Sequence, residues 1–237
     1  MSTTQARPNF WHHLALKTRF AHARLKKGTV RFKTSNLASV YAAYEERGIA
    51  YVVLRWAAEV PMEQSEEAGY TKDVDHLIAA KDVMAALDVS SAYPGKIKCD
   101  YYSAEGRSGT SYNGMPYYQP ARALSILTHR IRDPRGFYRP CLEDEFFAFA
   151  YHLCYHKGHR AGIPTGTDAA PDTDASRDYL AELKRLAIKA QRNDLPDNIT
   201  LLDLHHYLER NKWGMPYDLM LRWTDRHPFM EALTRLE

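Results

Sequence analysis

Residues 72–78 read Lys-Asp-Val-Asp-His-Leu-Ile, and this stretch decides how the rest of the sequence is interpreted. The apolar residues that follow Asp73 predict a strand over residues 74–79. Side chains two positions apart in a strand point to the same side, so we expect Asp73 and Asp75 to present adjacent carboxylates. Two neighbouring carboxylates repel each other unless a cation lies between them. Mg²⁺ supplies that charge and binds carboxylates together with phosphate oxygens and water, so the stretch predicts a magnesium site.

The sequence on either side predicts an α+β domain with a mixed α/β arrangement. A helix that starts at Ser35 and ends at Gly48 precedes a buried strand over residues 49–54. A helix over residues 81–87 and a third strand over 97–102 follow the Asp-x-Asp strand, which is typical of a mixed sheet with flanking helices. The third strand carries Asp100, an acid that is costly to bury without a partner. If this strand pairs with the second one, Asp100 adds a third carboxylate to the site.

The second half of the chain is predicted to be mainly helical. Periodic apolar residues favour helices over residues 121–130, 143–157, 176–191, 200–210, 217–225 and 228–236. An Asn113-Gly114 turn signal predicts a hairpin over residues 111–119. We therefore expect a basic N-terminal helix within residues 1–29, an α+β domain over 30–120 and a helical domain over 121–237.

Composition limits the class of protein. The 237 residues are 45% hydrophobic and 26% charged, which fits one large or two small globular domains and excludes collagen-like and largely disordered chains. No apolar run approaches the roughly 20 residues of a membrane helix. The first residues lack the apolar run of a secretory signal, and three scattered cysteines favour reduced thiols. These features predict a cytoplasmic protein.

Charge is distributed unevenly along the chain. Residues 1–33 hold eight of the 32 Lys and Arg and no acid, so beyond residue 33 the remaining 24 basic residues face 29 acids, a net charge of −5. Nucleic-acid binding needs a basic reading surface, so we expect no nucleic-acid partner. One side of the N-terminal helix is predicted to carry Trp11, Leu14, Thr18, Ala21 and Leu25. Such a basic amphipathic helix covers its own domain or contacts an anionic membrane surface.

Residues 36–103 resemble the nucleotidyltransferase superfamily, which has the DNA polymerase beta-like fold, in their first strand and turn, Asp-x-Asp strand and third acidic strand. The resemblance implies that Asp73, Asp75 and Asp100 bind Mg²⁺ and that Asp100 lies nearest the acceptor hydroxyl. Most members carry Gly-Ser after the first strand, where this chain has Leu54-Arg55. Arg55 at that place predicts a phosphate clamp and resembles divergent members of the LicD/fukutin and polysaccharide-cluster types.

The resemblance implies a Mg²⁺-dependent transferase. Such an enzyme moves a nucleotidyl or phospho-alcohol group from a nucleotide donor to a small-molecule acceptor, for example a sugar or polysaccharide precursor. The alternative is an inactive member that binds a nucleotide or a protein. The residues expected to bind substrate phosphates are Arg55, Lys72, His156 and Lys157. The chain has no Walker-type loop, dinucleotide glycine fingerprint or Gly-x-Ser-x-Gly motif.

Glu145, His152 and His156 fall on one stripe of an apolar, and therefore buried, predicted helix. One interpretation is that the histidines are hydrogen-bonded within a helical core. A second is that the stripe faces the substrate, with His156 and Lys157 near the phosphates. A third is a zinc hydrolase site, because His152 and His156 have the spacing of helical zinc ligands, although Leu153 stands where that motif has its catalytic Glu.

Overall fold

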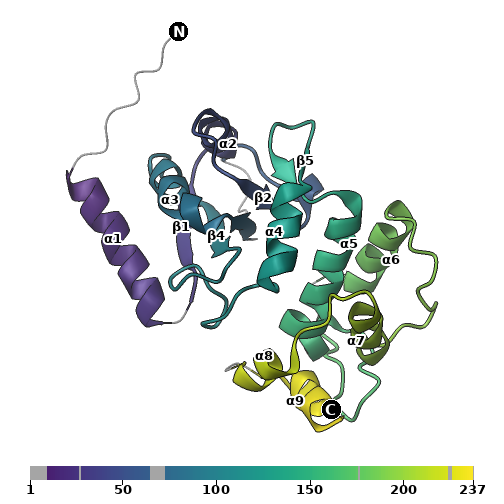
Figure 1. Ribbon diagram of the computed structural model, residues 1–237. Coiled ribbons are helices and arrows are strands. Elements are labelled where there is room, and N and C mark those ends of the chain that lie inside the picture. The colour runs from purple at the N-terminus through teal and green to yellow at the C-terminus, as the bar shows by residue number, and fades with distance from the viewer. Residues whose placement is uncertain (1–9, 27, 65–72, 176, 224–225, 237) are drawn as a thin grey trace. The chain divides into compact units, whose positions relative to one another are not determined.

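The computed structural model describes residues 10–26, 28–64, 73–175, 177–223 and 226–236, with side chains from residue 14 onward (Figure 1). The chain divides into two compact units, residues 1–117 with 132–139 and residues 118–131 with 140–237. Strands form a small mixed sheet in the first unit, and the second is mainly helical, so the α+β class is confirmed.

The elements of the described chain, in order, are α1 (Phe10–Leu25), β1 (Val30–Thr34), α2 (Leu37–Glu46), β2 (Tyr51–Val53), η1 (Ala57–Glu59), β3 (Val74–Ile78), η2 (Ala80–Asp82), α3 (Val83–Ser91), β4 (Ile97–Ser103), α4 (Pro120–Thr128), β5 (Ile131–Arg132), β6 (Tyr138–Arg139), α5 (Leu142–Tyr151), η3 (His152–Lys157), η4 (Gly158–Ala161), α6 (Tyr179–Lys189), α7 (Leu201–Arg210), α8 (Tyr217–Arg222) and α9 (Pro228–Leu236).

The sheet of the first unit has the strand order β1-β4-β3-β2. β3 and β4 are parallel, and the two outer pairs are antiparallel. β1 was not predicted, although its sequence alternates in the manner of a strand: Val30 and Phe32 are buried and Arg31 and Lys33 are exposed. The pairing of β3 with β4, on which the third carboxylate depends, is present.

One face of this sheet forms the core with residues of α1, α2 and α3. His76 belongs to this face: its Nε2 lies 3.0 Å from the Tyr41 hydroxyl, and its ring stacks on Tyr101. Burial lowers the pKa of His76 to about 4, so the imidazole is neutral at physiological pH. Because neighbours in a strand point to opposite faces, Asp75 lies on the other face of the sheet.

Several predicted boundaries differ from the structure. The N-cap of α2 is Asn36 and not Ser35, because the Asn36 side chain accepts a hydrogen bond from the Ser39 backbone N–H. The predicted hairpin over 111–119 is reduced to a turn with a single bridge between Tyr112 and Met115. The predicted helix over 143–157 is α-helical only to Tyr151 and continues as the π-helix η3.

The side of α1 that packs also differs from the prediction. Leu16, Phe20 and Ala23 are buried, whereas Leu14 and Leu25, expected on the apolar side, are exposed. Phe20 and Leu16 join the core cluster of the first unit, so the burial of α1 is set by its tertiary neighbours.

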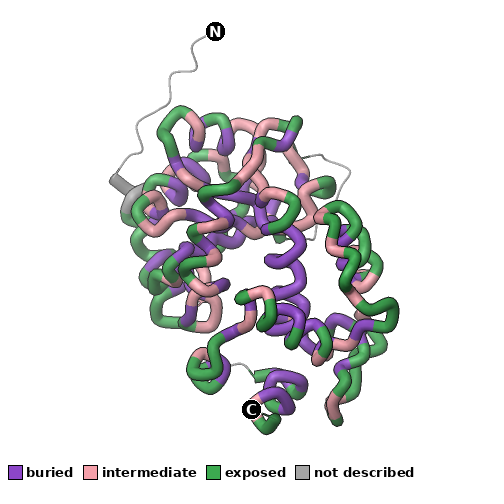
Figure 2. Tube along the Cα trace, turned by 45° about the vertical axis from the view of Figure 1, so that its right-hand side comes forward, coloured by how far each residue is buried: buried purple, intermediate pink, exposed green. Residues whose placement is uncertain are grey.

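The second unit packs its helices around aromatic side chains. α5 and η3 are buried over most of their length, which identifies them as the centre of this unit (Figure 2). Phe147 stacks on Trp213 with ring centroids 5.4 Å apart. The predicted N-cap Thr200 starts α7 with a capping box, in which Asp203 bonds back to the Thr200 N–H.

Within the part of the chain that the structure describes, we find no helix with the length and apolar character needed to span a bilayer.

Candidate functional site

Three residues of three neighbouring strands form a row across the sheet. Arg31 of β1 is the register partner of Asp100 in β4, and Asp100 is the register partner of Asp75 in β3. Register partners in adjacent strands extend to the same side of a sheet, so the three side chains share the face opposite the core. The pairing thereby places two predicted metal ligands next to each other.

Arg31 links this row to Asp73. Its Nε donates to Asp100 Oδ1 and its Nη2 to Asp100 Oδ2, both at 2.6 Å, and Nη2 also donates to Asp73 Oδ2 at 2.8 Å. The Asp100 side chain is only 7% exposed, whereas that of Arg31 is 50% exposed. A bidentate guanidinium therefore compensates the buried carboxylate while keeping one edge in contact with solvent.

Arg55 holds Asp75 from the side of β2. Its Nη2 donates to Asp75 Oδ2 and its Nη1 to the Tyr117 hydroxyl, both at 2.6 Å. The Arg55 side chain is only 6% exposed, and its guanidinium lies over the Tyr117 ring. In this arrangement Arg55 orients Asp75, and the predicted role as a phosphate clamp would require it to leave these partners.

The three carboxylates influence one another electrostatically. Burial raises the pKa of Asp100 above its ordinary value, the hydrogen bonds from Arg31 lower it, and the charges of Asp75 and Asp73 raise it again. The same ion pairs raise the pKa of Arg31. We define Arg31, Asp73, Asp75 and Asp100 as the carboxylate–arginine cluster.

The donor chemistry of the carboxylate–arginine cluster fits Mg²⁺, which prefers carboxylate oxygens. Among contacts between described residues, the Oδ1 atoms of Asp73 and Asp75 accept no hydrogen bond. However, the carboxylate oxygens of the three acids, all described residues, do not all lie within 4.8 Å of one another. A bound Mg²⁺ would therefore have to draw the carboxylates together and replace part of the contact that Arg31 makes.

A pocket of about 630 Å³ adjoins the carboxylate–arginine cluster through Arg31. Arg19 and Lys33 also line it, together with apolar side chains that include Leu16, Phe32 and Pro94. Arg19 lies over the Phe32 ring at 5.2 Å, which fixes its guanidinium beside β1. None of these three cations was among the predicted site residues, although the alternation over residues 30–34 could have identified the strand that carries Arg31 and Lys33.

Three further residues, Lys72, His156 and Lys157, were predicted to bind substrate phosphates. Lys72 is outside the described residues. His156 and Lys157 belong to the second unit, where His156 is buried against Tyr151 and Trp223. The Lys157 ammonium lies 5.3 Å from the centre of the Tyr179 ring.

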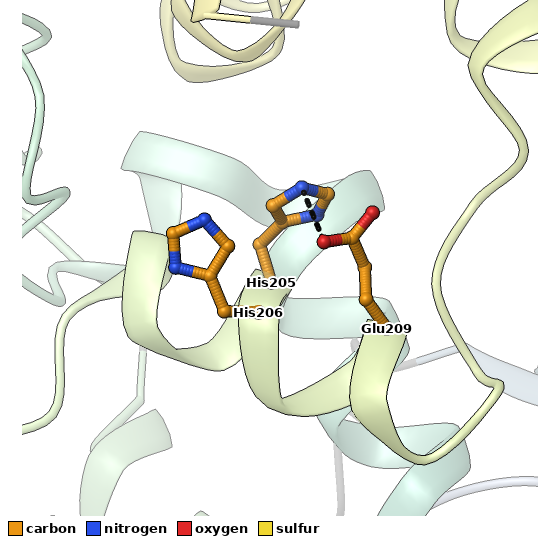
Figure 3. Close-up of side chains that lie close together, drawn as sticks. All are labelled: His205, His206 and Glu209. Carbon is orange, nitrogen blue, oxygen red and sulfur yellow. Dashed lines mark ion pairs between the residues drawn. The ribbon is translucent and has the colours of Figure 1, made fainter.

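The zinc interpretation of His152 and His156 has no third ligand among the described residues. The two rings meet edge to face, with centroids 5.7 Å apart. The described part of the chain holds a different compact group of metal-ligating side chains, which consists of His205, His206 and Glu209 on α7 (Figure 3).

Membership of the nucleotidyltransferase superfamily stays a prediction. Comparison with known proteins finds no matching protein-family model, no matching curated protein and no matching solved structure.

Proposed function

We propose that the carboxylate–arginine cluster binds a nucleotide together with Mg²⁺, and that the chain transfers a nucleotidyl or phospho-alcohol group from it to a small-molecule acceptor such as a sugar or polysaccharide precursor. The observation that supports this proposal is the direct pairing of Asp75 with Asp100, with Asp73 joined to them through Arg31. A group of three acids costs electrostatic energy, and a bound divalent cation would offset that cost.

Each residue of the cluster has a distinct part in the proposed reaction. Bound Mg²⁺ supplies positive charge that stabilises the transferring phosphoryl group. Asp73 and Asp75 offer it their Oδ1 atoms. Asp100 would accept the proton of the acceptor hydroxyl once Arg31 releases one of its two oxygens, and burial, which raises its pKa, makes it a more effective base at neutral pH.

The pocket beside Arg31 provides the site for the donor phosphates. Arg19, Arg31 and Lys33 are the basic residues among those that line it. Guanidinium groups bind phosphate through paired N–H donors, and a fixed cation stabilises the charge that develops during transfer. In this proposal Asp73 and Asp75 would hold Mg²⁺, and Arg31 would exchange its hydrogen bond to Asp73 for one to a phosphate oxygen.

A second candidate function is metal-independent nucleotide binding without transfer. It is favoured by the hydrogen bonds from Arg31 to both oxygens of Asp100, which already neutralise the most buried acid. Arg55 donates one hydrogen bond to Asp75 Oδ2 and forms an ion pair with it. In this alternative the two arginines replace the metal, and the pocket with Arg19 and Lys33 binds the phosphates.

Calorimetric titration of nucleoside triphosphates and nucleotide-activated alcohols, with and without Mg²⁺, distinguishes the two candidates. Mg²⁺-dependent binding that is lost in Asp75→Asn supports the transferase. Metal-independent binding that persists in Asp75→Asn and is lost in Lys33→Gln supports the second candidate. Asp88→Asn is the matched control, since Asp88 forms a surface ion pair with Arg47 in the same unit. If no nucleotide binds under either condition, both candidates are wrong.

A further inference from the structure

Three potential metal ligands converge on one side of α7. His205, His206 and Glu209 each offer a ligand atom, and these atoms all lie within 4.8 Å of one another (Figure 3). His205 Nε2 lies 3.5 Å from Glu209 Oε2. Glu209 follows the histidines by four and three positions, and side chains at these spacings lie next to each other on a helix. The short stretch of α7 over residues 205–209 therefore supplies all three potential metal ligands.

The imidazole of His205 is held in place by a neighbouring helix. Its Nδ1 lies 2.9 Å from the hydroxyl of Tyr155, which belongs to η3, and His205 is buried. If a metal binds Nε2, the ring proton must be on Nδ1, and the Nδ1–H then donates a hydrogen bond to the Tyr155 hydroxyl oxygen. Metal-ligating histidines typically use their second nitrogen in this manner, which fixes the tautomer and the ring orientation.

The side chain of Glu209 has space beside Gly214 and access to solvent. A Cβ at position 214 would lie 2.7 Å from Cγ of Glu209, so Gly214 allows the glutamate side chain to occupy this position. His206 and Glu209 are exposed. A metal ion can therefore reach the group from solvent.

We propose that His205, His206 and Glu209 form a binding site for Zn²⁺. Two imidazole nitrogens and one carboxylate oxygen are a common ligand set for zinc with three protein ligands. Mg²⁺ prefers an all-oxygen set, so this site discriminates against the ion proposed for the carboxylate–arginine cluster. The site is independent of the proposed transferase function and uses other histidines than the predicted His152 and His156.

Calorimetric titration of the purified, metal-free full chain with Zn²⁺ tests the proposal. We expect one site that His206→Ala and Glu209→Gln each weaken at least tenfold. Both residues are exposed, so these variants are expected to keep the fold, which circular dichroism checks. His22→Ala is the matched control, because His22 is an exposed histidine on α1 and its loss should leave zinc binding unchanged.

Tyr155→Phe provides a second and more specific variant. It keeps the aromatic ring and removes the hydroxyl that orients His205, so zinc affinity should fall by about 10-fold to 100-fold. Co²⁺ in place of Zn²⁺ gives a visible absorption band that reports ligand geometry, and the band should be lost in His206→Ala. The proposal is wrong if the full chain binds no zinc, or if His206→Ala and Glu209→Gln bind it as tightly as the His22→Ala control.

Discussion

Asp75 and Asp100 face each other across the parallel strands β3 and β4, although they are 25 positions apart in the sequence. Their register partner in β1, Arg31, neutralises Asp100 with two hydrogen bonds and reaches Asp73 with a third contact. The site is therefore a product of strand pairing. Arg31, Asp100 and Asp75 come from three neighbouring strands, and Asp73 directly precedes β3.

Arg31 and Asp100 should depend on each other for stability. Arg31→Gln leaves Asp100 buried near two other carboxylates, so we expect the first unit to lose about 1–3 kcal/mol of unfolding free energy. Hydrogen exchange of the β4 amides measures this unit alone. In the double variant Arg31→Gln/Asp100→Asn the loss should be smaller than the sum of the single losses. Additive losses would contradict the coupling, and Arg47→Gln, which removes an exposed ion pair, should change little.

The neutral His76 should make the metal-free first unit less stable in acid. Its pKa in the folded chain is about 4, below the ordinary 6.5, so between these values the unfolded chain binds a proton that the folded chain does not. The unfolding free energy should therefore fall by up to about 3 kcal/mol as the pH drops from 6.5 to 4. Hydrogen-exchange measurements on the β3 amides across this pH range should show a shallower fall in unfolding free energy for His76→Gln than for the native chain. Equal slopes of unfolding free energy against pH in the two would contradict the role of His76.

The start of α2 gives a test with a neighbouring control. Asn36 accepts a hydrogen bond from the Ser39 N–H at 2.8 Å, so Asn36→Ala should destabilise the first unit by about 1 kcal/mol. Ser35→Ala removes a hydroxyl that does not cap the helix and should cost less than about 0.5 kcal/mol. Urea unfolding, monitored by hydrogen exchange at the α2 amides, measures both losses of stability. A larger loss for Ser35→Ala would place the cap one residue earlier.

Gly158 should not tolerate a side chain. Its φ is +53°, and a Cβ would lie 2.0 Å from the His227 ring. Gly158→Ala should therefore destabilise the second unit by more than about 2 kcal/mol, through backbone strain and the displacement of His227. Gly48 also has a positive φ, but no described atom lies within 4 Å of the point that a Cβ would occupy there, so Gly48→Ala should cost only about 1 kcal/mol. Similar thermal shifts for the two variants would contradict the steric argument.

The sequence predicts the elements that have a strong local pattern. The apolar residues that follow Asp73 and the β-favouring residues around Asp100 predict strands that the structure contains, and the capping signal at Thr200 marks the start of α7. β1 was not predicted, because its five residues follow shortly after a basic helix and two of them, Arg31 and Lys33, are charged. Its partner β4 lies far along the chain, so the pairing that gives Arg31 its role has no local signal.

Tertiary contacts decide the features that the sequence left open. The predicted apolar side of α1 is exposed at Leu14 because burial is set by what Leu16 and Phe20 meet in the first unit. The His-His-x-x-Glu spacing of α7 is visible in the sequence, but its alignment depends on Tyr155 from another helix. Such long-range contacts have no periodic pattern that a single sequence reveals.

The most direct test of the proposed site is the position of a bound metal in the first unit. Mn²⁺, which binds oxygen ligands and broadens nearby NMR signals, is titrated into the isotope-labelled full chain together with the tightest-binding nucleotide. The account predicts that the amides of Asp73, Asp75 and Asp100 broaden first, and that Asp75→Asn abolishes this effect while Asp88→Asn does not. Broadening confined to other parts of the chain, or unchanged by Asp75→Asn, would contradict it.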